Sequence, residues 1–216
     1  MDKGCKICHS QTEEFHHEKF GMIFHQCASC DFIWKDSSIH VGPDEEFEIY
    51  ENHNNSIHDR KYVRYLKDFV DASVVPFIGE GSKGLDFGSG PEPVLSAIME
   101  RDYGYDMDIY DKFYSTHRVY MDKNYDLVTS TEVVEHLDDP LEYFSLFGRL
   151  LREDGILAIM TLFHPQDREG FLDWFYIRDA SHISFYTPRT LEVISDKTGL
   201  DFIFTDNHRY STFRLK

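Results

Sequence analysis

Four cysteines with a regular spacing are the first residues that could do chemistry. Cys5 and Cys8 form one Cys-x-x-Cys pair, and Cys27 and Cys30 form a second pair eighteen residues further on. Two such pairs, each on a tight turn, supply the four thiolates of a closed tetrahedral zinc site. A closed site has no open position for a reaction, so the spacing predicts a structural zinc ion. Two disulfides or a redox Cys-x-x-Cys motif are the alternatives. Disulfides need an oxidising compartment that nothing here implies. A redox motif does not require a second Cys-x-x-Cys pair.

A glycine turn is the second feature with a chemical meaning. Segment 83–90 (Lys-Gly-Leu-Asp-Phe-Gly-Ser-Gly) is typical of a short strand that runs into a turn, and segment 91–100 of the helix that follows. Gly88 and Gly90 let the backbone approach a ligand closely, and a helix N-terminus favours an anionic group. The turn lacks the third glycine of the dinucleotide fingerprint, and Glu92 would repel a pyrophosphate. A ligand with one carboxylate and one ammonium group fits the turn better.

An acidic residue ends the next predicted strand, at 105–111. Asp111 lies about twenty residues beyond the glycines. A carboxylate in that place can accept hydrogen bonds from both ribose hydroxyls of an adenosine. A solvated loop carboxylate is the alternative interpretation of this residue.

Strands and helices that alternate along the chain predict how these residues are positioned. Strands are expected at 125–130 and 155–161, with a helix at about 141–151 between them. The second strand is apolar throughout, as strands buried in parallel sheets are. The fold class is therefore α/β, with a Rossmann-like, doubly wound and mostly parallel sheet. Ligands of such sheets bind at the carboxyl ends of the strands. That rule gathers into one crevice the residues 86–90, 111, 130–132 and 162–164.

The chain divides into three expected parts. We predict a zinc-ribbon-like, zinc-binding module at residues 1–36, a connecting loop and helix at 37–80, and the ligand-binding domain at 81–216. In the connecting part, apolar residues at a helical period predict a helix at about 57–72, and Pro76 limits its extent.

Composition narrows the class of partner. The formal charge is −17, from 22 basic and 39 acidic residues, and such a chain repels phosphate backbones. We therefore expect no nucleic-acid partner. No apolar run approaches the ~20 residues that span a membrane, and the first ten residues lack an apolar signal region. These features favour a cytoplasmic protein with reduced thiols and without a membrane partner.

Several segments together resemble one family. Segment 85–91 (Leu-Asp-Phe-Gly-Ser-Gly-Pro) resembles motif I of the class I S-adenosylmethionine-dependent methyltransferases, and segments 125–128, 132–136 and 150–155 resemble later landmarks of that family. Segment 174–187 is similar to a pattern in a branch of small-molecule methyltransferases. Some members of that branch carry an N-terminal four-cysteine module and an acidic loop with a His-x-Asn-like element, here at 53–55. The resemblance covers nearly the whole chain.

The resemblance implies S-adenosylmethionine as the methyl donor. Gly88 and Gly90 would admit its methionine part, Asp86 would hold its ammonium group and Asp111 its ribose. The residues implied in donor binding are Asp86, Gly88, Ser89, Gly90, Asp111, Ser130, Thr131, Glu132, His53 and Asn54. Only fourteen residues separate Asp111 from Asp126, where the family usually places a helix and a third strand, so we expect the far edge of the sheet to be trimmed.

Three histidines are candidates for the general base that a hydroxyl or carbon-acid acceptor needs. They are His136, His164 and His182. Residues 174–186 are rich in aromatic side chains. Together with residues 50–55 they are expected to form a lid over the crevice, with His182 facing the acceptor. In the alternative, these aromatics belong to the core and His182 hydrogen-bonds the backbone.

Three functions are compatible with the sequence. The leading hypothesis is a methyltransferase acting on a small molecule, such as a sugar or another metabolite. A second is an RNA or protein methyltransferase that uses the zinc module as a reader, although the acidity counts against RNA. A third is a non-catalytic S-adenosylmethionine-binding or scaffold protein with a degenerate donor site, favoured by Glu92 in motif I and by the short segment after Asp111.

Overall fold

A six-stranded sheet forms the centre of the protein, which we describe from a computed structural model over residues 4–51 and 56–216. Four of its strands are parallel, and β10 is antiparallel to both of its neighbours. The doubly wound, mostly parallel sheet predicted from the sequence is confirmed. Across the sheet, the strands are β5 (Asp106–Tyr110), β4 (Lys83–Phe87), β6 (Tyr125–Thr131), β7 (Leu151–Met160), β10 (Tyr210–Leu215) and β9 (Leu200–Thr205).

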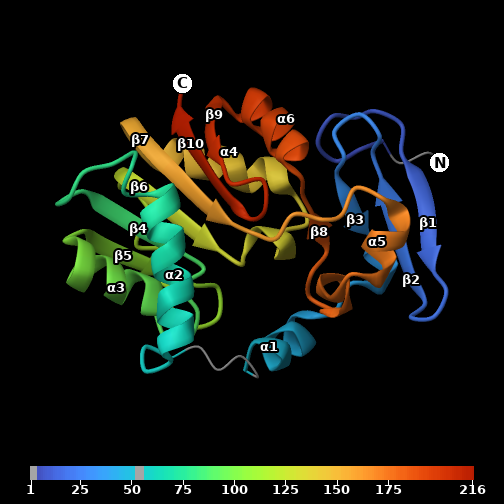
Figure 1. The fold of residues 1–216 in the computed structure, drawn as a ribbon, viewed down its shortest axis with the longest axis horizontal. Helices are drawn as coiled ribbons and strands as arrows, with labels where there is room; N and C mark the ends of the chain where they lie inside the picture. The colour runs from blue at the N-terminus through green and yellow to red at the C-terminus, as the bar shows by residue number, and fades with distance from the viewer. Residues whose placement is uncertain (1–3, 52–55) are drawn as a thin grey trace.

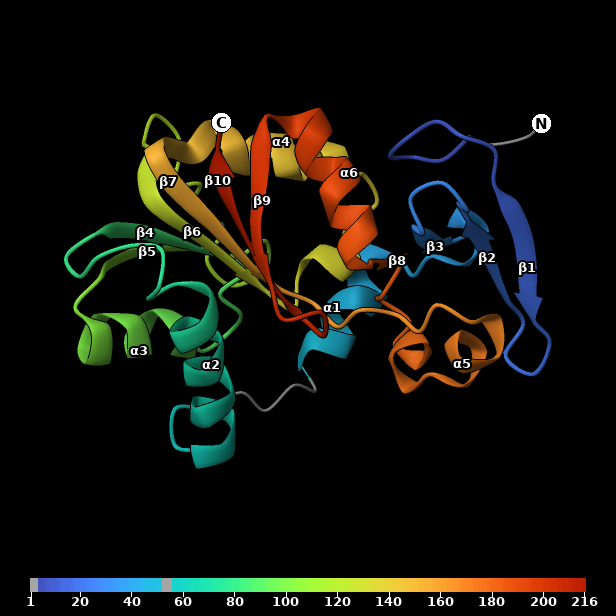
Figure 2. The ribbon, with the colours of Figure 1, turned by 45° about the horizontal axis from the view of Figure 1, so that its top comes forward.

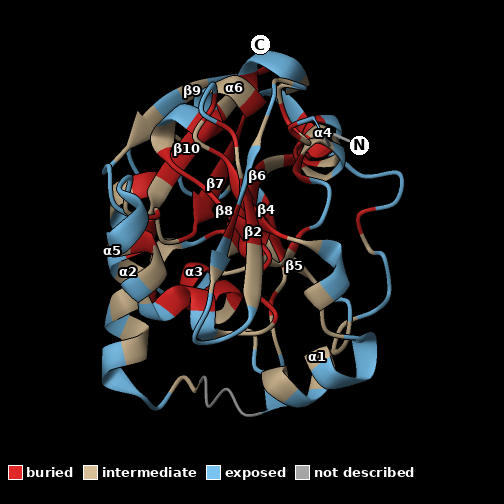
Figure 3. Cartoon of the chain, turned by 90° about the vertical axis from the view of Figure 1, so that its right-hand side faces the viewer, coloured by how far each residue is buried: buried red, intermediate tan, exposed pale blue. Residues whose placement is uncertain are grey.

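Two pairs of helices cover the two faces of this sheet (Figure 1; Figure 2). Helices α2 (Arg60–Ser73) and α3 (Val94–Tyr103) pack on one face, and α4 (Pro140–Leu150) and α6 (Pro188–Thr198) pack on the other. Side chains of a strand alternate between faces, so β7 supplies both layers. Ile156 and Ala158 belong to the core beneath α2 and α3, while Leu157 and Ile159 belong to the core beneath α4 and α6. The inner strands β4, β6 and β7 are accordingly mostly buried, whereas the edge strand β5 is not (Figure 3).

Local sequence signals explain where the helices begin and end. The carboxylate of Asp59 caps α2 by accepting hydrogen bonds from the backbone N–H groups of Lys61 and Tyr62, so this helix begins at Arg60, slightly later than the expected residue 57. Helix α3 ends at Gly104, whose φ of 70° places it in the left-handed conformation that terminates many helices.

The sheet ends early on the side of β5, as the short segment after Asp111 predicts. Strand β5 is the edge strand, and residues 112–124 return through turns, with neither helix nor strand, to β6. The chain then crosses to the other side of β4, where β6 pairs with it, so no strand lies beyond β5 in this sheet within the described residues.

A second, four-stranded sheet lies beside the first. Three antiparallel strands come from the N-terminus, β1 (Glu13–His17), β2 (Met22–Gln26) and β3 (Ile33–Lys35). The fourth, β8 (Ser184–Phe185), comes from the far end of the chain and pairs with β3. The small sheet is therefore completed by residues outside segment 1–36.

Shorter helices connect and cover these sheets. They are η1 (Ser37–Ile39), α1 (Pro43–Glu51), η2 (Val134–His136), α5 (Arg168–Asp173) and η3 (Phe175–Arg178). No helix within the described residues is both long and apolar enough to cross a membrane.

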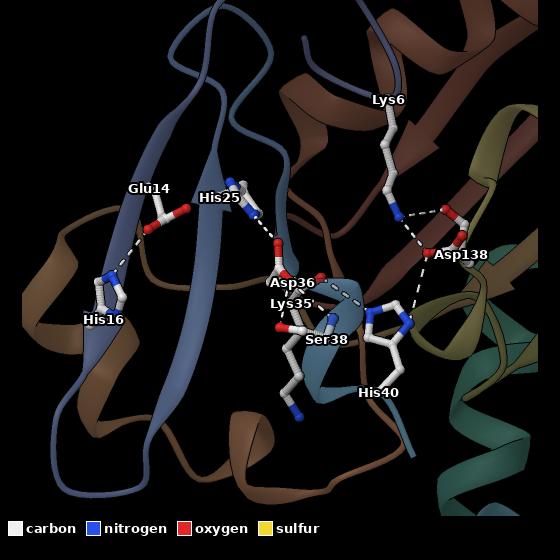
Figure 4. A network of polar contacts seen from close by, with 9 residues as sticks. All are labelled: Lys6, Glu14, His16, His25, Lys35, Asp36, Ser38, His40 and Asp138. Carbon is white, nitrogen blue, oxygen red and sulfur yellow. Dashed lines mark hydrogen bonds and ion pairs between the residues drawn. The ribbon is translucent and has the colours of Figure 1, made fainter. Parts of the chain in front are cut away.

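The N-terminal sheet is joined to the rest of the protein by polar and apolar contacts. Figure 4 shows Lys6 in contact with the carboxylate of Asp138, which also lies 3.9 Å from Nδ1 of His40. The Thr190 hydroxyl of α6 donates to the backbone carbonyl of Cys30 at 2.8 Å. Phe32 and Trp34 belong to the same buried cluster as α4 and α6, as do three of the cysteines.

Candidate active site

A cavity of about 430 Å³ opens at the carboxyl ends of the parallel strands. This volume is within the range of small-molecule pockets. Its walls include residues of α1 and α2, the turn after β4, the residues after β5, the segment after β6, and η3 with the residues that follow it. The wall residues used below are Tyr50, Tyr65, Asp86, Gly88, Ser89, Gly90, Asp111, Thr131, Glu132, His136, Phe175, Tyr176, Asp179 and His182.

The turn after β4 needs glycine at its first position. Gly88 has a φ of 89°, and a Cβ atom added there would lie 2.2 Å from Cγ2 of Val133. The N–H groups of Gly88 and Ser89 both donate to the carbonyl of Tyr110, at 2.7 and 3.1 Å. The turn is therefore packed against the segment after β6 and tied to the end of β5, which leaves its backbone along the cavity.

Asp86 lies at the bottom of the cavity and is buried. The hydroxyl of Thr129 donates to its Oδ1 at 3.1 Å. Burial raises the pKa of this carboxyl to about 7, and the nearby Asp111 adds to the shift. A cationic group bound in the cavity would stabilise the ionised form.

We expect Asp86→Asn to stabilise the ligand-free protein relative to the wild type, and this gain in stability should be larger at pH 8 than at pH 5.5. The raised pKa means that the folded state holds the proton more tightly than the unfolded chain. The free energy of unfolding therefore falls as pH rises from about 4 to 7, and the full cost is present above 7. The neutral amide avoids this cost, with a gain on the order of 2 kcal/mol. Thermal unfolding of the variant and of the wild type at the two pH values measures this gain. An equal gain at pH 5.5 and pH 8 would contradict ionisation of Asp86 as the source of the cost.

Asp111 connects two parts of the cavity wall. Its Oδ2 accepts a hydrogen bond from Gly90 N at 3.0 Å, and its Oδ1 accepts from Phe113 N at 2.8 Å and Tyr114 N at 3.1 Å. The carboxylate thus fixes the glycine turn relative to the loop after β5. It is buried and lines the cavity, so it is not a solvated loop carboxylate.

Two carboxylates and two tyrosines form a network on another wall. Tyr65 donates to Oε1 of Glu132 at 2.6 Å, and Arg209 donates to the Tyr65 oxygen. The Tyr176 hydroxyl lies 2.8 Å from Oε2 of Glu132 and 2.5 Å from Oε1 of Glu135. One phenol hydrogen therefore serves two carboxylates. Sequence reasoning missed Tyr65, Glu135 and Arg209, because only the fold brings them together.

His136 and His182 form a pair of neutral imidazoles beside this network. Their ring centroids are 4.7 Å apart. Nδ1 of His136 lies 3.1 Å from the carbonyl of Ser181, and Nδ1 of His182 lies 3.0 Å from that of Tyr176. Burial lowers the pKa of His136 to about 3 and also lowers the pKa of His182. Because carbonyls only accept, Nδ1 carries the hydrogen in both rings and Nε2 keeps its lone pair.

Only some of the other predicted residues line the cavity. His164 lies outside the cavity, with Nδ1 and Nε2 each 2.8 Å from a carbonyl, those of Pro165 and Asp31. Ser130 is buried inside β6 and does not line the cavity, whereas Ser89, Thr131 and Glu132 do. His53 and Asn54 lie outside the described residues.

The predicted lid divides into two groups of aromatics. Trp174 and Phe185 pack with Phe171 in a buried cluster against the small sheet. Phe175 is 64% exposed and lines the cavity together with Tyr176. The ring of Tyr50 in α1, 5.2 Å from the ring of His136, lines the same cavity. The segment is thus part core and part cavity wall.

The four cysteines converge on one point. They are free thiols whose Sγ atoms all lie within 4.8 Å of one another, with Cys5 and Cys30 3.5 Å apart and Cys8 and Cys27 3.4 Å apart. Zinc bonds of ~2.3 Å in a tetrahedron place sulfurs about 3.8 Å apart, so the donor set fits this ion. Two equivalent turns hold the pairs: His9 N donates to Cys5 O, and Asp31 N donates to Cys27 O.

Comparisons with known proteins bear on the fold and family. A family model for a methyltransferase domain matches residues 57–203. A search of curated proteins gives no match. Among solved structures, the mitomycin 7-O-methyltransferase MmcR is similar with a TM-score of 0.57 and 10% identity, over 79% of this chain and 60% of that protein.

Two other solved structures have the same fold. Phosphoethanolamine N-methyltransferase 2 from Haemonchus contortus has a TM-score of 0.53 and 17% identity, over 81% of this chain and 57% of its own. CalO1, a methyltransferase of calicheamicin biosynthesis with S-adenosylhomocysteine bound, has 0.52 and 12%, over 72% and 55%. The chain spans 55–60% of the length of these three proteins.

Proposed function

Because this chain belongs to the S-adenosylmethionine-dependent methyltransferase domains, we propose that it methylates a small molecule held in the 430 Å³ cavity. The observation that carries the proposal is the placement of two walls in one cavity. The glycine turn with Asp86 and Asp111 forms one wall, and the neutral pair His136 and His182 belongs to another. A donor and an acceptor can then meet between them.

The donor wall fits S-adenosylmethionine, which when bound supplies a methyl group on a sulfonium. The close approach at Gly88 leaves backbone N–H groups, rather than side chains, along the methionine part. Buried Asp86, with its raised pKa, is stabilised in the ionised form by the ammonium group. Asp111 has one lone pair on Oδ2 beyond its bond to Gly90, and this oxygen can accept from a ribose hydroxyl.

The acceptor wall positions a nucleophile and excludes water. Tyr50, Phe175 and Tyr176 enclose the cavity near the histidine pair. The Nε2 lone pairs of His136 and His182 are available to a hydroxyl of the acceptor. Alignment of that oxygen with the sulfonium accounts for much of the rate of an in-line transfer. The net charge of −17 disfavours RNA as the acceptor.

The four-cysteine cluster serves as a structural zinc site in this proposal. Four thiolates close the coordination of the ion, and the cluster lies in the buried core that the small sheet shares with α4 and α6. Its role is to fix the small sheet, and through β8 the residues beside His182.

The donor site is tested by calorimetry with S-adenosylmethionine. We expect binding by the wild type and a loss of about 1–3 kcal/mol in Asp111→Ala, because charge-assisted hydrogen bonds to the ribose are removed. Asp201→Ala, which removes an exposed carboxylate on β9, is the matched control. Unchanged affinity in Asp111→Ala would remove this residue from the donor site, and absence of any binding heat in the wild type would favour a non-catalytic scaffold.

The acceptor is identified by incubating the protein and S-adenosylmethionine with a metabolite pool, with mass spectrometry of methylated products. Parallel reactions contain bulk tRNA and rRNA or a protein extract. Methylation confined to the metabolite pool supports the proposal, and methylation confined to the macromolecules overturns it.

A further inference from the structure

Three side chains on the acceptor wall gather around one point. Each of Glu135, His136 and His182 offers one ligand atom, and these atoms lie within 4.8 Å of one another. Glu135 is fully buried and the two imidazoles line the cavity. A carboxylate and two imidazoles form a donor set that first-row divalent metals favour.

One oxygen of Glu135 has no partner in the described structure. Oε1 accepts from Tyr176, but Oε2 is buried without a hydrogen bond. The side chain of Thr161 lies beside this carboxylate and lowers its pKa, but its hydroxyl forms no hydrogen bond of ordinary geometry with the described residues. A buried carboxylate oxygen without a donor is costly unless a ligand or cation satisfies it.

Both histidines make a backbone hydrogen bond of the kind that metal-ligating histidines make. Each uses Nδ1 to bond a backbone carbonyl, Ser181 for His136 and Tyr176 for His182. Such outer hydrogen bonds fix the tautomer and leave the other nitrogen, with its lone pair, for a metal. The carboxylate of Asp179 lies 3.7 Å from Nε2 of His182, too distant for a hydrogen bond, and adds negative potential, which the nearby Lys35 opposes in part.

The charges around this point favour a cation. Glu132 contributes a second carboxylate beside Glu135, and the single hydrogen of Tyr176 lies between the two. A divalent ion bound to Oε2 of Glu135 would leave the hydrogen bond from Tyr176 to Oε1 in place.

We propose that Glu135, His136 and His182 bind a divalent transition-metal cation on the acceptor wall of the cavity. This site is separate in chemistry from the cysteine cluster, because its donors are oxygen and nitrogen rather than sulfur. Three protein ligands leave an open position, and the histidines face the cavity, so an oxygen of the acceptor can take that position. This last consequence rests on the proposed function, whereas binding of the ion does not.

The test is a titration with Co²⁺ of protein whose cysteines already hold zinc. We expect one equivalent to bind, with visible d–d absorption and without the near-ultraviolet charge-transfer band that thiolate ligands give. Glu135→Gln and His182→Gln should each weaken Co²⁺ binding by at least tenfold. His164→Gln, which alters a buried histidine outside the cavity, should bind Co²⁺ as the wild type does.

Several results would overturn the metal site. They are no Co²⁺ absorption up to about 1 mM in the wild type, a thiolate band that accompanies the bound ion, and undiminished affinity in the folded variants. Circular dichroism establishes that each variant is folded, and His136→Gln replaces any variant that is not. Calorimetry with S-adenosylmethionine on the same protein separates the two ideas: donor binding without Co²⁺ binding overturns the metal site alone, and the converse overturns the methyltransferase proposal alone.

Discussion

His182→Ala is expected to lower the rate of methyl transfer by about 10²-fold or more while the affinity for S-adenosylmethionine stays unchanged. The variant removes the Nε2 lone pair from the acceptor wall, where it acts on the acceptor as a base or through a bound cation. The donor wall, with Asp86 and the glycine turn, has no hydrogen bond to this histidine. The effect should therefore fall on turnover and spare donor binding.

The measurement is a single-turnover rate with the acceptor found in the metabolite screen. Donor affinity is measured by calorimetry and stability by thermal unfolding on the same samples. His164→Gln is the control, since it alters a buried histidine outside the cavity. A His182→Ala protein that loses melting temperature but turns over normally at low temperature would show that this residue only supports the fold.

Loss of zinc is expected to lower the melting temperature by about 10 °C. Cys27→Ser removes one of the four thiolates. If loss of the ion lowers the free energy of unfolding by on the order of 4 kcal/mol, the melting temperature of a chain of this length falls by about 10 °C. Three of the cysteines lie in the buried cluster shared with α4 and α6, and Cys8 packs against it, so the loss should spread beyond the small sheet. Because β3 pairs with β8, methyl transfer should fall as well.

Elemental analysis and thermal unfolding measure this effect. Ser29→Ala, on the same turn but exposed, is the control and should keep one zinc per chain. Wild-type protein purified without chelator but free of zinc would end the assignment of the metal. A zinc-free Cys27→Ser protein with unchanged melting temperature would show that the ion does not support the fold.

Much of the central fold could be predicted because its signals are local. The apolar run of β7 and the glycine turn after β4 each lie within a few consecutive residues, and parallel strands bring their carboxyl ends together whatever their sequence. Strand β8 could not be predicted, because a strand of two residues shows no alternation of polar and apolar side chains. Its pairing partners, Ile33 and Trp34, also lie far away in the sequence.

The site was predictable to the same extent. Asp86 is the penultimate residue of strand β4, and Gly88 and Asp111 directly follow strands, so their common location in the cavity follows from the sheet. His164 also follows a strand end, yet the chain turns it toward Asp31 of the small sheet, a contact that sequence reasoning cannot foresee. The hydrogen bonds of Tyr65 and Tyr176 to Glu132 join residues 44 to 67 positions apart, which no local pattern encodes.

The pairing of β3 with β8 also constrains how the chain is made. Lys35 leaves the ribosome early, but the partner strand ends at Phe185, 150 residues later. At ordinary rates of synthesis that interval lasts on the order of 10 s. During it, the growing chain exposes an unpaired strand edge, which invites pairing with other chains. A zinc ion bound early by the cysteines would hold this edge in a compact, folded module. Pairing with other chains would then be limited until the second half of the protein has been synthesised.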